Sequence, residues 1–129
     1  MCIRDSRTSA SGDASDTTVY ATYAIGGLTV GYQWSEADLG TTTGAQQYDN
    51  TGYGITFAIN DDLSIGYNHY ESEQTNSTNV TNESTSVQIA YSMGGASVRL
   101  ASADGENMAY QTGTAYDRDV TTLSVALAF

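Results

Sequence analysis

The stretch TTLSVALAF, residues 121–129, closes the chain on a strictly alternating pattern. Large apolar side chains occupy every second position, and small or hydroxylated side chains lie between them. Successive side chains of a β-strand point to opposite faces of the sheet, so this pattern predicts a strand with one apolar and one polar face. Strands of transmembrane β-barrels have this pattern because one face meets lipid and the other faces the lumen.

Six further segments show the same alternation, at residues 17–25, 28–36, 51–59, 63–71, 84–92 and 96–103. Within each pair of segments lies a short turn sequence, Gly26-Gly27, Asn60-Asp61-Asp62 or Gly94-Gly95, of the kind that favours β-hairpins. Longer polar stretches connect one pair to the next. The sequence therefore predicts an all-β fold, an antiparallel up-and-down meander of about seven strands that forms part of a transmembrane β-barrel.

The composition supports strands and narrows the classes of function. The 129 residues include no Pro, 13 Gly and 10 Tyr, and no apolar run approaches the roughly 20 residues of a membrane-spanning helix. A formal net charge of -11 argues against binding to nucleic acid. Because Cys2 and His69 are the single cysteine and histidine, we assign no disulfide, metal ligand, cofactor or catalytic residue, and expect no enzyme.

The first sixteen residues, MCIRDSRTSASGDASD, differ from the rest of the chain. They show neither the hydrophobic core of a signal peptide nor strand alternation. We expect residues 1–16 to be a non-barrel N-terminal segment, with residues 1–7 foreign or part of a truncated loop and residues 8–16 a polar loop. Residues 17–129 then form the C-terminal part of a barrel. Since bacterial barrels normally have an even number of strands, seven strands predict that others precede this sequence.

Aromatic residues of the apolar phase fall into two groups along the predicted strands. The short turns and the chain end define one rim, and the long connections define the other. Aromatic side chains favour the two interfaces of a membrane, so two girdles are predicted. They comprise Tyr23, Phe57, Tyr91 and Phe129 at the short-turn rim, and Trp34, Tyr53 and Tyr67 toward the long-loop rim. A β-sandwich also buries one apolar face, but it does not predict two belts.

The last strand resembles the C-terminal assembly signal of Gram-negative outer-membrane proteins, which the barrel-assembly machinery reads. The match covers Leu123, Val125, Leu127 and Phe129. Together with YAIGGLTVGYQWSEADLG, YGITFAINDDLSIGYNHYE and YSMGGASVRLASAD, it makes residues 17–129 resemble Gram-negative general porins of the alphaproteobacterial type. The resemblance implies a 16-stranded, homotrimeric, water-filled channel in the outer membrane, surrounded by lipid and lipopolysaccharide, for passive diffusion of ions and small hydrophilic solutes. The family's constriction loop follows an early strand and is not part of this sequence.

The side chains that alternate with the apolar ones along each predicted strand form the polar phase, and they predict the wall of the lumen. Its hydrogen-bonding side chains would allow water to wet the wall, and they include Gln33, Asn68, Gln88, Ser97, Arg99, Arg118, Thr122 and Ser124. Arg99 is the one charged residue inside the inward face of a predicted strand, and Arg118 shares its phase at the mouth. The resemblance implies that a wall arginine helps to set the field across the pore. The alternatives are a solvated side chain or a pair with a nearby carboxylate.

Nearly all carboxylates fall in predicted loops: Glu36, Asp38, Asp49, Glu71, Glu73, Glu83, Asp104, Glu106 and Asp117. Three interpretations are open for these carboxylates: solvated surface charge, a vestibule that attracts cations, or divalent-cation sites beside lipopolysaccharide phosphates. Catalysis would need a nucleophilic serine on the strand beside His69, and the sequence shows no such pair. Two other classes stay open: a small outer-membrane barrel acting as an adhesin or structural surface protein, and a soluble β-sandwich binding module.

Overall fold

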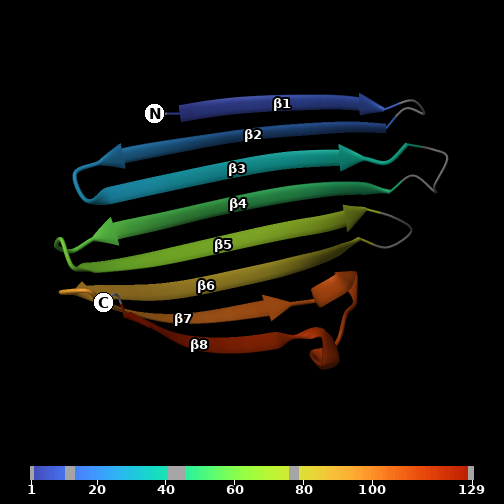
Figure 1. Ribbon diagram of the computed structural model, residues 1–129. Helices are drawn as coiled ribbons and strands as arrows, with labels where there is room; N and C mark the ends of the chain where they lie inside the picture. Colours follow the sequence, from blue (N-terminus) through green and yellow to red (C-terminus); the bar gives the residue numbers. More distant parts are fainter. Residues whose placement is uncertain (1, 11–13, 41–45, 76–78, 128–129) are drawn as a thin grey trace.

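The protein forms one open antiparallel sheet whose eight strands follow each other in chain order (Figure 1). The computed structural model describes residues 2–10, 14–40, 46–75 and 79–127, and over residues 2–10 it describes the backbone alone. The strands are β1 (Cys2–Ala10), β2 (Ala14–Ile25), β3 (Leu28–Asp38), β4 (Gln47–Ala58), β5 (Leu63–Thr75), β6 (Val80–Met93), β7 (Ala96–Glu106) and β8 (Arg118–Leu127). The predicted all-β, antiparallel, up-and-down arrangement is confirmed.

Short turns join the paired strands at one rim of the sheet, as predicted. Gly94 and Gly95 adopt positive φ angles of 52° and 94°, which a tight hairpin turn requires and which glycine adopts without steric cost. In the turn between β4 and β5, Oδ1 of Asn60 accepts hydrogen bonds from the backbone N–H groups of Asp62 and Leu63, at 2.9 and 2.8 Å. The opposite rim carries the connections 39–46, 76–79 and 107–117, of which 39–46 and 107–117 are long. The prediction of a long loop between β5 and β6 is wrong, because 76–79 has the same length as the turn 59–62 between β4 and β5.

Strand structure begins before residue 17, within the segment 1–16 that was predicted to contain a polar loop. Cys2–Ala10 forms β1, which pairs with β2, and β2 already begins at Ala14. Hydrogen bonds between strands use backbone groups, which every residue except proline can supply in full, so a polar segment without alternation can still extend a sheet. The sheet has eight strands, whereas about seven were predicted. The earlier inference that strands are missing because their number is odd therefore no longer holds.

Strands β2 to β7 all extend farther toward the long-loop rim than predicted, and β4, β5 and β6 extend farthest. β4 begins at Gln47 instead of residue 51, β5 ends at Thr75 instead of residue 71, and β6 begins at Val80 instead of residue 84. Polar residues on both faces remove the alternation by which a strand is recognised, while the backbone continues to pair. Much of the predicted loop sequence is therefore strand.

The sheet has an apolar face and a polar face. Directly opposed residues of antiparallel strands lie on the same face, and the register carries the predicted apolar phase intact from β2 to β8. One row of direct partners consists of Ile25, Leu28, Phe57, Ile65, Ile89, Leu100 and Leu123. Among the described side chains, no hydrophobic residue is buried. An apolar surface this large requires a cover, either lipid or protein.

The connection between β7 and β8 contains two short 3-10 segments, η2 (Met108–Tyr110) and η3 (Thr114–Tyr116). Segment η2 lies against β6, so the connection folds back toward the sheet (Figure 1). No helix in the described part of the chain is long and apolar enough to cross a membrane.

Candidate functional site

The polar face gathers every residue that the sequence predicts to line a lumen. On the first strands, Gln33 lies opposite Gly52, and Asn68 lies opposite Gly54. The other pairs are Gln88 with Gly66, Ser97 with Ala126, Arg99 with Ser124, Thr122 with Ala101, and Arg118 with Gly105. The register therefore places all eight predicted residues on one continuous surface.

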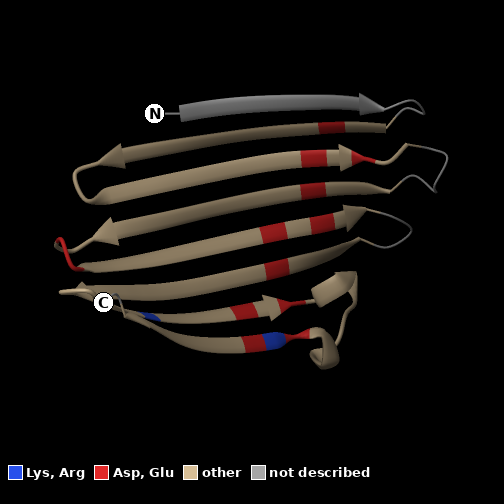
Figure 2. Cartoon of the chain, viewed as in Figure 1, with Lys and Arg blue, Asp and Glu red and all other residues tan. Residues whose placement is uncertain are grey.

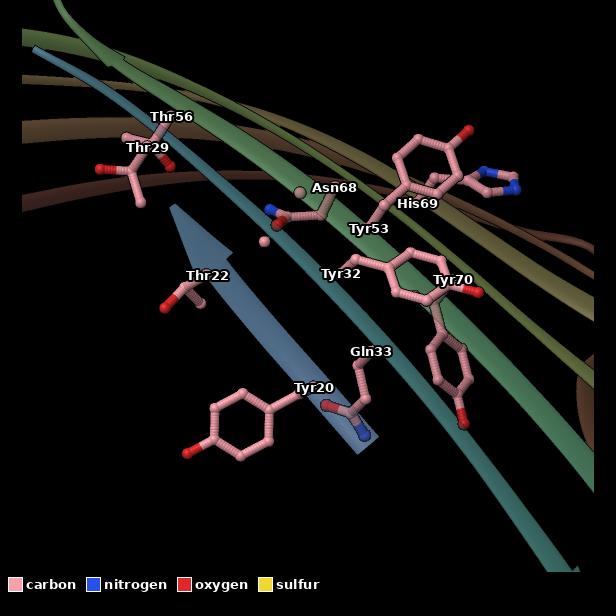
Figure 3. Close-up of a pocket in the computed structure, with 13 residues that line it drawn as sticks. Tyr20, Thr22, Thr29, Tyr32, Gln33, Tyr53, Thr56, Asn68, His69 and Tyr70 are labelled. Carbon is pink, nitrogen blue, oxygen red and sulfur yellow. The ribbon is translucent and has the colours of Figure 1, made fainter. Parts of the chain in front are cut away.

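Glycines hollow the centre of the polar face. A depression of about 420 Å³ spans β2 to β5, and Gly31, Gly52 and Gly54 contribute to its lining. A Cβ atom added at Gly54 on β4 would come within 2.5 Å of Asn68 Oδ1, so the Asn68 side chain extends from β5 over the backbone of Gly54. Gln33 and Asn68 extend to one side of the sheet, whereas Tyr53 and His69 extend to the other (Figure 3). The glycines keep this part of the surface low, and no charged residue of the described ranges lines it.

Arg99 and Arg118 are the only charged residues on the polar face of β3 to β8, because all carboxylates of these strands have the opposite phase. Arg99 borders a second hollow, of about 230 Å³, together with Ser64 and Gln88. Among the described residues, the only contact at ion-pair distance joins His69 to Glu71. The alternative in which Arg99 pairs with a carboxylate is therefore not seen in this part of the chain.

The carboxylates of β3 to β8 have the phase of the apolar face, and the acidic positions of these strands lie near the long-loop rim (Figure 2). The prediction that the carboxylates lie in loops is wrong for all except Asp117: Glu36 and Asp38 lie on β3, and the others on β4 to β7. Their positions are opposite one another in three rows, namely Glu36–Asp49–Glu73, Glu71–Glu83–Glu106 and Asp104–Asp119. Like charges in direct opposition destabilise a sheet. Among the described residues, no group of carboxylates is arranged to hold a metal ion.

The Asp104–Asp119 pair shows the effect of this crowding. A hydrogen bond with Asp104 raises the pKa of Asp119, and repulsion from the Asp104 charge and partial desolvation act in the same direction. An acid whose pKa is raised in the folded state stabilises that state only while it holds its proton. The folded state therefore loses stability as the pH rises from about 3.8, the ordinary value, through the raised pKa.

We expect Asp119→Asn to stabilise the protein folded in detergent micelles at pH 7, because it removes one of two facing charges. A rise of about 2 °C in the unfolding midpoint is expected at pH 7, and little or none at pH 3, where the Asp119 carboxyl holds its proton. Asp61→Asn, which removes a carboxylate from the exposed turn at the other rim, is the control. An equal gain at both pH values would show that charge repulsion is not the cause.

The predicted girdle residues within the described ranges all lie on the apolar face, and Phe129 lies outside those ranges. Trp34 lies opposite Thr51, two residues from Tyr53, and Tyr53 lies opposite His69, two residues from Tyr67. The long-loop aromatics thus shift by two residues per strand and form an oblique line. Leu123, Val125 and Leu127 of the predicted assembly signal also lie on this face, on β8.

The histidine has partners that the sequence did not reveal. Nδ1 of His69 lies 2.9 Å from Oγ1 of Thr85, and Nε2 lies 2.8 Å from Oε1 of Glu71. The hydroxyl partner on the adjoining strand is a threonine, where a serine was sought. Nucleophilic catalysis also needs free donors for an oxyanion, but β6 is paired with β5 and β7 on both sides of Thr85. We therefore assign no catalytic role to this group.

A hydrogen-bonded cluster at the long-loop end of the polar face was not predicted. Oδ1 of Asn50 accepts hydrogen bonds from Tyr70 OH at 2.9 Å and from Ser72 Oγ at 2.5 Å. Ser72 Oγ also lies 2.6 Å from the hydroxyl oxygen of Tyr110, which belongs to the β7–β8 connection. Ser72 is 3% exposed and is the only buried polar residue in the described ranges. Strand alternation assigns Tyr70 to this face, but it gives no signal for Tyr110.

Comparison with known proteins finds no matching family model, no similar curated protein and no similar solved structure. The function is therefore argued from the sheet itself.

Proposed function

We propose that this chain is the C-terminal part of a Gram-negative outer-membrane porin. In the complete barrel, for which we propose 16 strands and a trimeric assembly, the apolar face contacts lipid and the polar face lines a water-filled lumen. Ions and small hydrophilic solutes then cross by passive diffusion. The observation that carries this proposal is the oblique course of the apolar residues across the sheet.

The apolar band ends at one edge toward the long-loop rim. From β2 to β8, this edge shifts steadily toward the short-turn rim. Ile25 on β2 and Leu123 on β8 belong to the same row of direct partners. On β2 the band extends to Val19, six residues from that row toward the long-loop rim. On β8 the band ends at Leu123, in the row itself, because the next residue on the apolar face is Thr121. The edge thus descends six residues over the six steps from β2 to β8, which is one residue per strand.

This slope converts into a strand tilt. A residue advances about 3.4 Å along a strand, and neighbouring strands lie about 4.8 Å apart. If the edge of the band is horizontal in a membrane, the tangent of the tilt is about 0.7, and the tilt is about 35°. Transmembrane β-barrels have strands tilted by roughly 35–45°. A flat membrane boundary therefore accounts for a band that runs obliquely to the hydrogen-bonded rows.

The carboxylates support the same boundary. On each strand we take the carboxylate of the apolar face that lies nearest to the row of Leu28 and Leu123. On β3 this is Glu36, eight residues from the row, and on β8 it is Asp119, four residues from the row. This line descends alongside the edge of the apolar band. Aromatic and then charged residues above a lipid-facing band are typical of the outer interface of a barrel.

Eight strands also fit a second candidate, a small closed barrel that acts as an adhesin or structural surface protein. Barrels of this size close with their first and last strands hydrogen-bonded, and side chains fill their interior. Here β1 and β8 form the two edges of the sheet and are not paired with each other (Figure 1). Open edges and a polar face hollowed by glycines favour a wider barrel that contains additional strands.

The proposal is tested by blocking the channel from a defined wall position. In the complete barrel, with Cys2 replaced by Ser, Thr56→Cys places a thiol on the polar face, and Ile55→Cys places one on the apolar face. We expect a charged, water-soluble thiol reagent to change the single-channel conductance of Thr56→Cys in planar bilayers and to leave Ile55→Cys unchanged. The adjacent residues serve as matched controls for each other.

Absence of channels from the unsubstituted barrel would refute the porin function and favour the small-barrel alternative. Channels that respond to the reagent at Ile55→Cys but not at Thr56→Cys would refute the assignment of the two faces.

A further inference from the structure

The β7–β8 connection folds over the polar face and reaches three strands away from its own hairpin. The Tyr110 ring lies 5.5 Å from the Tyr48 ring on β4, measured between centroids and tilted by 57°. The Tyr110 hydroxyl contacts Ser72 on β5, as described above. Tyr48 and Ser72 both have the polar phase, so Tyr110 lies on the proposed lumen side.

The backbone of the connection is shaped to hold this position. Asn107, Ala109 and Tyr110 adopt left-handed conformations, with φ of 51°, 59° and 55°, which residues other than glycine seldom adopt. Nδ2 of Asn107 donates to the Thr81 carbonyl oxygen at 3.0 Å, and its backbone N–H donates to Asp117 Oδ1 at 3.2 Å. These contacts anchor the connection to β6 and bring its two ends together.

A glycine allows the close approach. Gly105 is buried, and a Cβ atom at this position would come within 2.9 Å of Met108 Sδ. Met108 therefore packs directly on the backbone at the end of β7. The chain turns inward here because the glycine leaves room for the side chain that follows it.

We propose that Asn107–Asp117 is a fixed constriction at the long-loop mouth of the channel, and that Tyr110 is the residue that holds it in place and limits the size of the solutes that enter. This inference rests on the proposed function, because the polar face becomes a lumen only in a closed barrel. The connection lies against β6, and the Tyr110 side chain extends from it to β5 and β4 on that face, so together they reduce the open cross-section.

The position of the connection can be tested without a channel measurement. Photo-oxidation joins neighbouring tyrosine rings, so Tyr48 and Tyr110 should form a dityrosine cross-link in the complete barrel. The chain contains no lysine, and trypsin cleavage after Arg99 and Arg118 releases Tyr110 on a different peptide from Tyr48. We expect mass spectrometry to detect the linked pair, and expect Tyr48→Phe and Tyr110→Phe each to abolish it.

The effect on permeation is tested with Tyr110→Ala. We expect single-channel conductance to rise about 1.5-fold and the uptake of larger neutral sugars into proteoliposomes to increase, because the narrowest cross-section limits both. Tyr116→Ala is the matched control, since Tyr116 lies in η3 of the same connection and its side chain is 41% exposed. Heat-dependent mobility on gels confirms that both variants are folded.

The possible outcomes separate the two proposals. A cross-link together with increased conductance for Tyr110→Ala alone supports the constriction. A cross-link without any change in conductance overturns the constriction and leaves the porin function intact. A missing cross-link overturns the inward position of the connection, and a barrel that forms no channel overturns the porin proposal and the constriction together.

Discussion

Ile65→Arg is expected to lower the free energy of unfolding of the complete barrel by roughly 2–4 kcal/mol, the cost of a lipid-facing arginine near the bilayer midplane. On β5 the apolar band consists of Leu63, Ile65 and Tyr67, so Ile65 lies at its centre. Its side chain is 39% exposed in the sheet itself and has no polar neighbour in its row of direct partners. The measurement is equilibrium unfolding by urea in lipid vesicles, followed by tryptophan fluorescence.

Ser64→Arg is the matched control for this substitution. Ser64 is adjacent in sequence but lies on the polar face, where its direct partners are Ala58 and Ala90. An arginine there would face water, so we expect a change within about 0.5 kcal/mol. Equal losses for the two variants would show that both faces are buried in protein, as in a β-sandwich, and would exclude the lipid-facing assignment.

The chemistry of the two faces could be predicted from the sequence because both depend on alternation. A side-chain period of two assigns each residue to a face without knowledge of its partners, and only the turns are needed to set the register. Gly94-Gly95 and Asn60-Asp61-Asp62 gave those turns correctly, so the predicted apolar residues from Val19 to Leu127 share one face.

The ends of the strands could not be predicted in this way. Above the apolar band both faces are polar, as at Glu73 and Gln74 on β5, and a segment of this kind reads as a loop even though its backbone pairs. The same limit applies to β1, which lacks alternation. Pairing there depends on a neighbouring strand that the local sequence does not describe.

The position of Tyr110 was beyond prediction for a different reason. It depends on left-handed conformations at three consecutive or nearly consecutive non-glycine residues, and on contacts with Ser72 and Tyr48, which are 38 and 62 residues away in sequence. Irregular connections follow no periodic pattern, so their course emerges only from the packing.

The separation of charge between the two faces changes how selectivity should be understood. All carboxylates predicted to surround the mouth except Asp117 lie instead on the apolar face, between the proposed lipid boundary and the long-loop rim. The only charged residues on the polar face of β3 to β8 are the two arginines, Arg99 and Arg118. In the proposed porin, cation attraction by the acidic line would therefore act around the rim of the barrel, while the charge of this part of the wall would be positive.

Arg99→Ala is expected to raise the preference of the complete porin for cations over anions, because it removes one of two positive charges from this wall. Arg99 lies midway along β7 beside the polar hollow formed with Ser64 and Gln88, whereas Arg118 lies at the first residue of β8. We expect about a twofold change in the permeability ratio for Arg99→Ala at 0.1 M salt, where the Debye length is about 10 Å, and a smaller change for the control Arg118→Ala. Both effects should shrink at 1 M salt, where the Debye length is about 3 Å. The measurement is the reversal potential across a salt gradient, and an unchanged potential for Arg99→Ala would place this residue outside the selectivity region as an ordinary wetted side chain of the wall.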